Sequence, residues 1–286
     1  MELARRISAV CGQDVRDVRR IGGQHGWGHY AVTLADGREA FAKVSGTGTR
    51  AAFEAEARGL RWLAEAAAMP IPDVLGWDGH ALVLSWVAPG RADRAAAGSF
   101  GRELARLHAA GATSFGAPWP GFIASLPLDN TPWPAERGWP EWYAERRILP
   151  YLRRAADAGT LSPADVRLVE TVTGRIGELA GPAEPPSRIH GDCWSGNVMW
   201  SAGRGWLIDP AAHGGHRETD LAMLALFGAP HLEHIIRGYT RAAPLADGWW
   251  SRVPLHQLHP LLVHVCLFGV GYRDAVLAAA RAALSS

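Results

Sequence analysis

The sequence contains little cysteine. Its 286 residues include three, Cys11, Cys193 and Cys266, and they stand far apart. An odd number at such spacing predicts neither a disulfide framework nor a zinc-binding pattern, and it is typical of a reducing compartment. We therefore expect a cytoplasmic protein that does not depend on disulfide bonds.

Long apolar runs are also missing. The N-terminal stretch MELARRISAVCGQDVRDV has no apolar segment as long as a signal peptide requires. The longest apolar run, PLLVHVCLFGVGY, is too short to cross a bilayer and contains His264. It predicts a buried helix, so we expect no membrane partner.

Neither sign of charge is in excess, because 29 Lys and Arg residues balance 28 Asp and Glu residues. A charge balance this even provides no electrostatic field that would attract nucleic acid, and we expect no nucleic-acid partner. Any phosphate group must therefore be bound by local features. A chain of this length suits two lobes or two small domains.

The hydrophobic periodicity changes after the first third of the chain. Apolar positions at three-to-four spacing predict a helix over residues 1–18, and the alternating runs that follow predict three strands separated by two turns. An amphipathic helix over residues 51–68 and two strands within residues 69–87 come next. Residues 1–87 are therefore expected to form a lobe with an antiparallel sheet and one inserted helix.

The stretch APGRAD, residues 88–93, marks the expected boundary between the lobes. Beyond it, residues 88–286 predict a mainly helical lobe. A run rich in proline and tryptophan at 117–140 predicts an ordered loop, and Ser162 begins a helix with a capping box completed by Asp165. The expected helices cover residues 98–111, 140–159, 162–181, 220–227, 231–242 and a long segment from about Pro254.

Three polar residues lie close together in the sequence of the second lobe. The motif HGDCWSGN places Asp192 five residues before Asn197, and IDP follows with Asp209. The stretch VMWSAGRGWLID between them predicts two short strands around a turn. Such a hairpin would return Asp209 to the side of Asn197, so the three side chains are expected at one end of it.

These residue types are those that phosphoryl transfer requires. Carboxylate and amide oxygens bind Mg²⁺, and a second carboxylate can accept the proton of an attacking hydroxyl. Kinases use an Asp, an Asn five residues later and a further Asp in these roles. We therefore predict Asp192 as the base and Asn197 and Asp209 as Mg²⁺ ligands. Each residue alone would more often be a turn former, but their joint spacing favours a site.

The first lobe offers the matching nucleotide-binding parts. Lys43 lies in the apolar strand FAKV, where an unpaired ammonium would be costly, and Glu56 on the next helix is its expected partner, with Glu54 as the fallback. The backbone near Ser85 and Val87 is expected to bind adenine. The turn IGGQHGWG, a weak indication alone, contributes glycines expected to cover the phosphates of ATP: Gly22, Gly23, Gly26 and Gly28.

At this point the motifs resemble a known family. The sequence is similar to the fructosamine kinase, or ketosamine 3-kinase, family within the aminoglycoside phosphotransferase and protein-kinase-like group. Four motifs carry the similarity: HGDCWSGN, IDPAAHGGHRETDLAML, GFIASLPLDNTPWP and WYAERRILP. The resemblance covers nearly the whole chain. It implies a bilobal α+β protein-kinase-like fold and ATP and Mg²⁺ as cofactors. It also implies phosphorylation of the 3-hydroxyl of free or protein-linked ketosamines, a deglycation reaction. We expect the enzyme to be a monomer.

The resemblance also implies a substrate side. Trp194 would stack on the sugar or shape its pocket, and His216, Arg217 and Glu218 would line that pocket. Each assignment has a structural alternative. Trp194 could serve only in packing, as most of the 13 tryptophans must, and Glu218 could be a solvated charge in the first turn of a helix. His190 is expected to fix the catalytic loop. No histidine spacing predicts a metal site.

The sequence departs from the family pattern at three places. Ser85 stands where an acidic hinge residue is common, which leaves the expected backbone contacts to adenine intact. The glycine-rich turn lacks the cysteine that can link two chains, so no disulfide-linked dimer is expected. Cys193 replaces a usual leucine after the base and is expected to fill the same apolar space. None of the three departures affects the residues predicted for phosphoryl transfer.

Two other functions stay open. The first is a small-molecule phosphotransferase of the aminoglycoside or choline kinase type, which would need an acidic pocket for a polycationic substrate. The second is a nucleotide-binding module without catalysis. Loss of the base, a metal ligand or the lysine would mark such a module, and Asp192, Asn197, Asp209 and Lys43 are all present.

Overall fold

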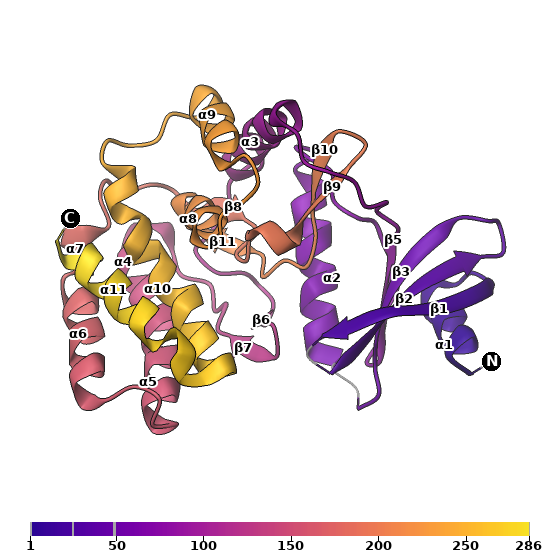
Figure 1. Cartoon of the computed structure of the whole chain (residues 1–286), viewed down its shortest axis with the longest axis horizontal. Coiled ribbons are helices and arrows are strands. Elements are labelled where there is room, and N and C mark those ends of the chain that lie inside the picture. The colour runs from indigo at the N-terminus through magenta and orange to yellow at the C-terminus, as the bar shows by residue number, and fades with distance from the viewer. Residues whose placement is uncertain (1, 25, 48–49, 286) are drawn as a thin grey trace.

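The computed structural model describes residues 2–24, 26–47 and 50–285, and Figure 1 shows a sheet at one end and a group of helices at the other. The sheet has five strands in the order β1-β2-β3-β5-β4, and all neighbours are antiparallel. Its elements are α1 (Glu2–Cys11), β1 (Val15–Gln24), β2 (Trp27–Leu34), β3 (Glu39–Ser45), α2 (Arg50–Glu65), β4 (Val74–Trp77) and β5 (Ala81–Ser85).

The two helices of this lobe cover opposite faces of the sheet. Side chains alternate along a strand, so Val83 packs with Ile7 of α1, whereas Leu82 and Leu84 pack in the cluster that contains Phe53 of α2. The predicted strands and the inserted helix are confirmed. The prediction of helix over residues 1–18 is wrong beyond Cys11, because Gly12 has a φ of 66° and ends the helix before β1 begins.

The chain passes from sheet to helix between Ser85 and Arg94, and the rest is mainly helical. The helices are α3 (Arg94–Ala109), α4 (Trp139–Tyr143), α5 (Leu149–Asp157), α6 (Pro163–Gly174), α7 (Ile176–Leu179), α8 (Glu218–Leu226), α9 (Leu232–Ala242), α10 (Trp249–Phe268) and α11 (Arg273–Leu284). The strands pair as hairpins or bridges: β6 (Gly121–Ile123) with β7 (Leu126–Leu128), β8 (Ser187–Ile189) with β11 (His213–Gly215), and β9 (Val198–Ser201) with β10 (Arg204–Leu207).

Several predicted elements differ in detail. The capping box at Ser162 is present, and α6 begins there as expected. The single helix predicted over 140–159 is interrupted by a π-helical segment at Ala144–Ile148, and the predicted loop over 117–140 contains the hairpin β6–β7. The long helix begins at Trp249 rather than near Pro254, because both Pro254 and Pro260 are accommodated inside α10.

The C-terminal helices combine a core face with an exposed end. By length and composition alone, the run Trp249–Leu284 could cross a membrane. However, a 3₁₀ turn at Gly269–Tyr272 divides it, and α10 and α11 pack side by side (Figure 1) with Leu258 and Val276 inside one core. The predicted buried helix is therefore correct for α10 but wrong at its end, where Phe268 is 58% exposed.

Candidate functional site

The candidate site forms around the loop between β8 and β9. The side-chain nitrogen Nδ2 of Asn197 donates to the main-chain oxygen and to Oδ2 of Asp192, each at 2.9 Å. It also donates to the main-chain oxygen of Asp209 at 3.4 Å. The hairpin β9–β10 brings these segments together, because the amide of Ile208 donates to the oxygen of Asn197 at 3.1 Å. The structure thus places the three predicted side chains in one group.

Lys43 joins this group to the other lobe. Its buried ammonium donates to both carboxylate oxygens of Glu56 at 2.8 Å and to Oδ1 of Asp209 at 2.6 Å. Glu54, the fallback partner, pairs with Arg58 instead. Burial acts to lower the pKa of Lys43, but the charges of Asp209 and Glu56 raise it above its ordinary value, so the ammonium stays charged.

Asp192 and Asp209 have different environments. Burial, followed by the nearby charge of Asp209, raises the pKa of Asp192 to about 7. Burial acts in the same direction on Asp209, but the charge and hydrogen bond of Lys43 outweigh it and lower the pKa of Asp209. One carboxylate therefore stays ionised, while the other is suited to accept a proton near neutral pH.

Asp209 also has an uncommon backbone conformation. Its φ is 56°, in the left-handed region that Asp adopts more readily than most residues. This conformation turns the chain sharply at the end of the hairpin. It directs the Asp209 carboxylate toward Lys43 and leaves the side chain 44% exposed.

A cavity of about 450 Å³ opens beside these groups. The acidic residues of its lining are Glu56, Asp192 and Asp209, and no Lys or Arg belongs to the lining among the described residues. The C-terminal helices form a wall without acidic groups. The side chains of that wall come from Pro260, Val263, His264, Leu267, Phe268 and Tyr272, and Phe122 and Phe227 adjoin it.

The glycine-rich hairpin β1–β2 reaches this cavity, and Gln24 and Trp27 belong to the lining. Gly26 has a φ of 83°, and a Cβ on Gly23 would lie 2.6 Å from the main-chain oxygen of Trp27, so the tight turn requires glycine at both positions. Gly22 and Gly28 belong to the two strands of the same hairpin. Residue 25 lies outside the described residues.

The linker between the lobes lies apart from the cavity lining. Ser85 is the last residue of β5, and its hydroxyl accepts the amide of Asp73 at 2.8 Å. Val87 follows in the linker and is buried. Neither residue belongs to the cavity lining, so an adenine contact here stays a prediction.

Trp194 does line the cavity. Its ring meets that of Phe227 edge-on, with 5.8 Å between centroids, and Phe227 in turn lies 5.2 Å from His264. An aromatic surface therefore extends from the catalytic loop to α10. Cys193 points the other way and is fully buried in the apolar core, as expected.

The structure places the predicted substrate residues, which stand at and just before the start of α8, outside the cavity lining. His216 and Glu218 are buried, and Arg217 makes two hydrogen bonds of 2.7 Å to Glu184. None of the three residues lines the cavity. These charges thus belong to a buried network behind the catalytic loop, because each finds a partner inside the protein.

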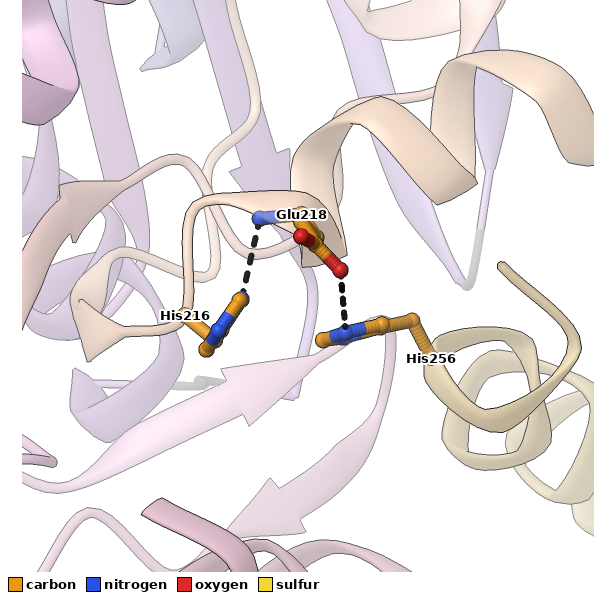
Figure 2. Close-up of side chains that lie close together, drawn as sticks. All are labelled: His216, Glu218 and His256. Atoms are coloured by element: carbon orange, nitrogen blue, oxygen red, sulfur yellow. Dashed lines mark hydrogen bonds and ion pairs between the residues drawn. The ribbon is translucent and has the colours of Figure 1, made fainter. Parts of the chain in front are cut away.

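Figure 2 shows Glu218 between two histidines. The amide of Glu218 donates to Nδ1 of His216 at 3.2 Å, and its carboxylate lies 3.5 Å from Nε2 of His256. These three side chains could hold a metal ion by proximity, with ligand atoms within 4.8 Å of one another. However, Arg252 donates to both oxygens of Glu218 at 2.6 and 2.9 Å. A cation beside that guanidinium would be repelled, so the arrangement favours a buried ion pair.

Sequence reasoning missed Asp220, which looked like an ordinary acidic residue at a helix start. It is fully buried, and its carboxylate accepts the amides of His190 at 2.8 Å and Gly191 at 2.9 Å. His190 fixes the loop as expected: Nδ1 accepts the amide of Asp192 at 3.3 Å, and Nε2 donates to the oxygen of Ile208 at 2.9 Å. One buried carboxylate and one imidazole thus hold the backbone around both aspartates.

Arg188 was also missed. It lies in β8, and its guanidinium donates to the main-chain oxygen of Trp62 near the C-terminal end of α2, with the guanidinium carbon 4.5 Å from the centre of the Trp62 ring. The C-terminal carbonyls of a helix lack partners within the helix, so this contact satisfies one of them. It connects the helix that carries Glu56 to the strand that leads into the catalytic loop.

Comparison with known proteins gives a consistent result. Residues 1–285 match the family model described as "Fructosamine kinase". A "probable ketoamine kinase" of Synechocystis is 33% identical over 283 residues, covering 95% of this chain and 92% of the relative. The chloroplastic "protein-ribulosamine 3-kinase" of Arabidopsis thaliana is 31% identical over 263 residues, covering 87% of this chain and 76% of the relative.

Solved structures agree. A Thermobifida fusca protein described as a candidate fructosamine-3-kinase is 53% identical and has a TM-score of 0.96, with 99% of each chain covered. An aminoglycoside phosphotransferase solved with ADP and hygromycin B has a TM-score of 0.63 at 16% identity, with 98% of this chain and 99% of that chain covered, which supports the fold alone. The predicted bilobal α+β kinase-like fold is therefore confirmed. The family match over almost the whole chain also confirms the predicted resemblance, and the chain belongs to the fructosamine kinase family.

Proposed function

We propose that this enzyme transfers a phosphoryl group from ATP to the 3-hydroxyl of ketosamines, which would allow the sugar to leave its amine. The observation that carries the proposal is the ion-pair group in which Lys43 bridges Glu56 and Asp209 beside the Asp192–Asn197 hydrogen bond. The relatives named ketoamine kinase and protein-ribulosamine 3-kinase support the substrate class.

The phosphate side is formed by the first lobe and the end of the hairpin β9–β10. Lys43 and the amides of the glycine-rich hairpin would bind the phosphates of ATP. The donor set fits Mg²⁺: Asp209 has a second carboxylate oxygen beyond the one that Lys43 binds, and Asn197 hydrogen-bonds through its nitrogen, which leaves its amide oxygen for a ligand. When bound, Mg²⁺ would neutralise charge on the transferred group.

Asp192 would act on the acceptor. Its carboxylate lines the cavity, and the hydrogen bond from Asn197 fixes its orientation. The sugar hydroxyl would donate to this carboxylate, which takes the proton as the bond from the sugar oxygen to the γ-phosphorus forms, the bond from that phosphorus to the bridging oxygen breaks and ADP leaves. Positioning and charge stabilisation are expected to provide most of the acceleration in such a reaction.

The substrate side favours a molecule with one positive charge. A ketosamine carries a single secondary ammonium, and aromatic rings such as Trp194, Phe227 and Tyr272 can bind a cation by its attraction to their faces. The carboxylates of the lining are those that catalysis itself uses. The wall from α10 provides none for the further ammonium groups of an aminoglycoside, so the cavity favours a ketosamine over a polycation.

The test is a kinase assay with ribulosyl-lysine, fructosyl-lysine and an aminoglycoside compared side by side. We expect Mg²⁺-dependent ADP formation with a ketosamine, and ³¹P–¹H NMR of the product should place the phosphate on the sugar O3. Turnover of the aminoglycoside alone would favour the phosphotransferase alternative. Nucleotide binding without turnover of any acceptor would favour the non-catalytic one.

A further inference from the structure

The buried network at the start of α8 has no role in the cavity, although it surrounds the carboxylate that holds the catalytic loop. We propose that His108 and Tyr239 are positioning residues for phosphoryl transfer and act on the loop through Asp220. This inference rests on the proposed function, and its substance is a chain of hydrogen bonds that crosses three helices.

The series of hydrogen bonds ends at the backbone amides just before Asp192, the proposed base. Asp220 accepts the amides of His190 and Gly191 with its two carboxylate oxygens, one each. Asp192 is the next residue, so the orientation of this carboxylate sets the path of the chain into the base. A carboxylate held by two flexible amides alone could rotate, and a third partner would prevent that.

His108 is the third partner. Its Nε2 lies 3.1 Å from Oδ2 of Asp220, and its Nδ1 lies 2.8 Å from the hydroxyl of Tyr239. An ionised carboxylate only accepts hydrogen bonds, so Nε2 of His108 carries the proton. In a neutral imidazole Nδ1 then accepts from the hydroxyl of Tyr239, and this hydrogen bond selects the tautomer in which His108 holds Asp220.

Close packing of α3 against α9 brings these residues together. A Cβ on Gly101 would lie 2.0 Å from the main-chain oxygen of Ile235, and a Cβ on Gly238 would lie 2.2 Å from that of Gly98. The two helices can approach so closely because these positions have no side chain. Tyr239 follows Gly238 directly, so the close approach places its hydroxyl against His108.

The rest of the network holds α8 itself. Glu184 binds Arg217, Arg252 binds Glu218, and the hydroxyl of Thr219 lies 3.0 Å from Nδ1 of His256. The residues just before Asp220 are therefore fixed from several sides. A helix start held in this way provides a rigid base. The hydroxyl of Tyr239 also interacts with Arg217 of this network, so the change at His108, which contacts Asp220 directly, is the sharper test of movement of the loop.

The experiment compares Tyr239→Phe, His108→Leu and His108→Gln with the control Tyr151→Phe. Tyr151 is also buried and donates one hydrogen bond, to the oxygen of Pro127 at 2.8 Å, away from the loop. We expect Tyr239→Phe and His108→Leu to lower kcat roughly tenfold or more with little change in the KM for ATP, because a displacement of about 1 Å costs up to roughly 100-fold. His108→Gln keeps an N–H donor for Asp220 and should recover much of the activity.

Hydrogen exchange of the peptide over residues 188–193 provides a readout that needs no substrate. We expect faster exchange of the amides of His190 and Gly191 in Tyr239→Phe and His108→Leu than in Tyr151→Phe, at temperatures where all variants are folded. Equal kcat and equal exchange in Tyr239→Phe and Tyr151→Phe, or no difference between His108→Leu and His108→Gln, would overturn the proposal. Failure of the wild type to phosphorylate any ketosamine would instead contradict the proposed function, and the exchange measurement would still decide the positioning role.

Discussion

The carboxyl group of Asp192 is placed where catalysis and stability oppose each other. In the unfolded chain it titrates near 3.8, whereas burial and then Asp209 raise its pKa to about 7 in the folded enzyme. The folded state therefore binds more protons between these values, and its stability falls as the pH rises from about 4 to about 7. A base suited to neutral pH is thus maintained at a cost in folding free energy.

Asp192→Asn should remove that cost. The amide has no charge to bury and can still accept the hydrogen bond of Asn197, so the variant should be nearly inactive but more stable than the wild type above pH 7. The gain should be on the order of 2 kcal/mol, since one pKa unit corresponds to about 1.4 kcal/mol and partial exposure reduces the effect. Urea unfolding between pH 4.5 and 8 measures it. A difference that stays constant across this range would contradict the assignment of the raised pKa to Asp192.

Residue types and their spacing predicted the group of Lys43, Asn197 and Asp209 because each must provide a charge or a ligand atom at a fixed place in the chain. The positions of His216 and Glu218 could not be predicted in this way. The sequence pattern around a charged residue at a helix start is the same whether the side chain faces a cavity or a buried arginine. What decided between these was Arg252, which is distant in sequence and carries no motif of its own.

At the scale of elements, α2 is held between the lobes. Arg188 contacts its C-terminal end, and Gly59 faces the segment that follows Asp209, where an added Cβ would lie 3.2 Å from Cβ of Ala212 and 3.4 Å from Cγ of Pro210. Amphipathic periodicity predicted this helix and the face it buries. It could not predict that a glycine in the helix adjoins the other lobe, because that contact depends on tertiary packing.

Gly59→Val should push α2 away from this segment and move Glu56 with it. The Lys43–Glu56 pair would then lengthen or shift, and kcat/KM for ATP should fall by about tenfold or more. The matched control is Gly177→Val, at an exposed position of the short helix α7, where an added Cβ meets nothing within 4 Å. Steady-state kinetics of both variants provide the comparison. Equal activity in the two would show that the close approach at Gly59 does not set the position of Glu56.

At the scale of the whole molecule, the sequence predicted two lobes and the fold class because periodicity changes where the sheet ends. It did not predict the cavity wall from α10, since residues such as Leu267 and Phe268 have the pattern of ordinary positions in an apolar helix. Only the packing of α10 beside the catalytic loop turns that end of the helix toward the site. The exposed Phe268 is thus explained by tertiary structure rather than by local pattern.

The two lobes meet at the ion pair between Lys43 and Asp209, so nucleotide binding should stabilise the molecule as one unit. A ligand that binds the folded state alone adds about 2.7 kcal/mol at a concentration of 100 Kd, and part of this should depend on Mg²⁺. Asp209→Ala removes both the charge that pairs with Lys43 and the proposed metal ligand. Its melting temperature should therefore rise with ATP by the same amount whether Mg²⁺ or EDTA is present, whereas the wild type should gain more with Mg²⁺. Because the lost ion pair also changes the starting stability, the quantity to compare is the shift that Mg²⁺ adds. If Asp209→Ala retained the full wild-type shift, the metal would have to be held elsewhere, and Asp209 would serve only to join the lobes through Lys43.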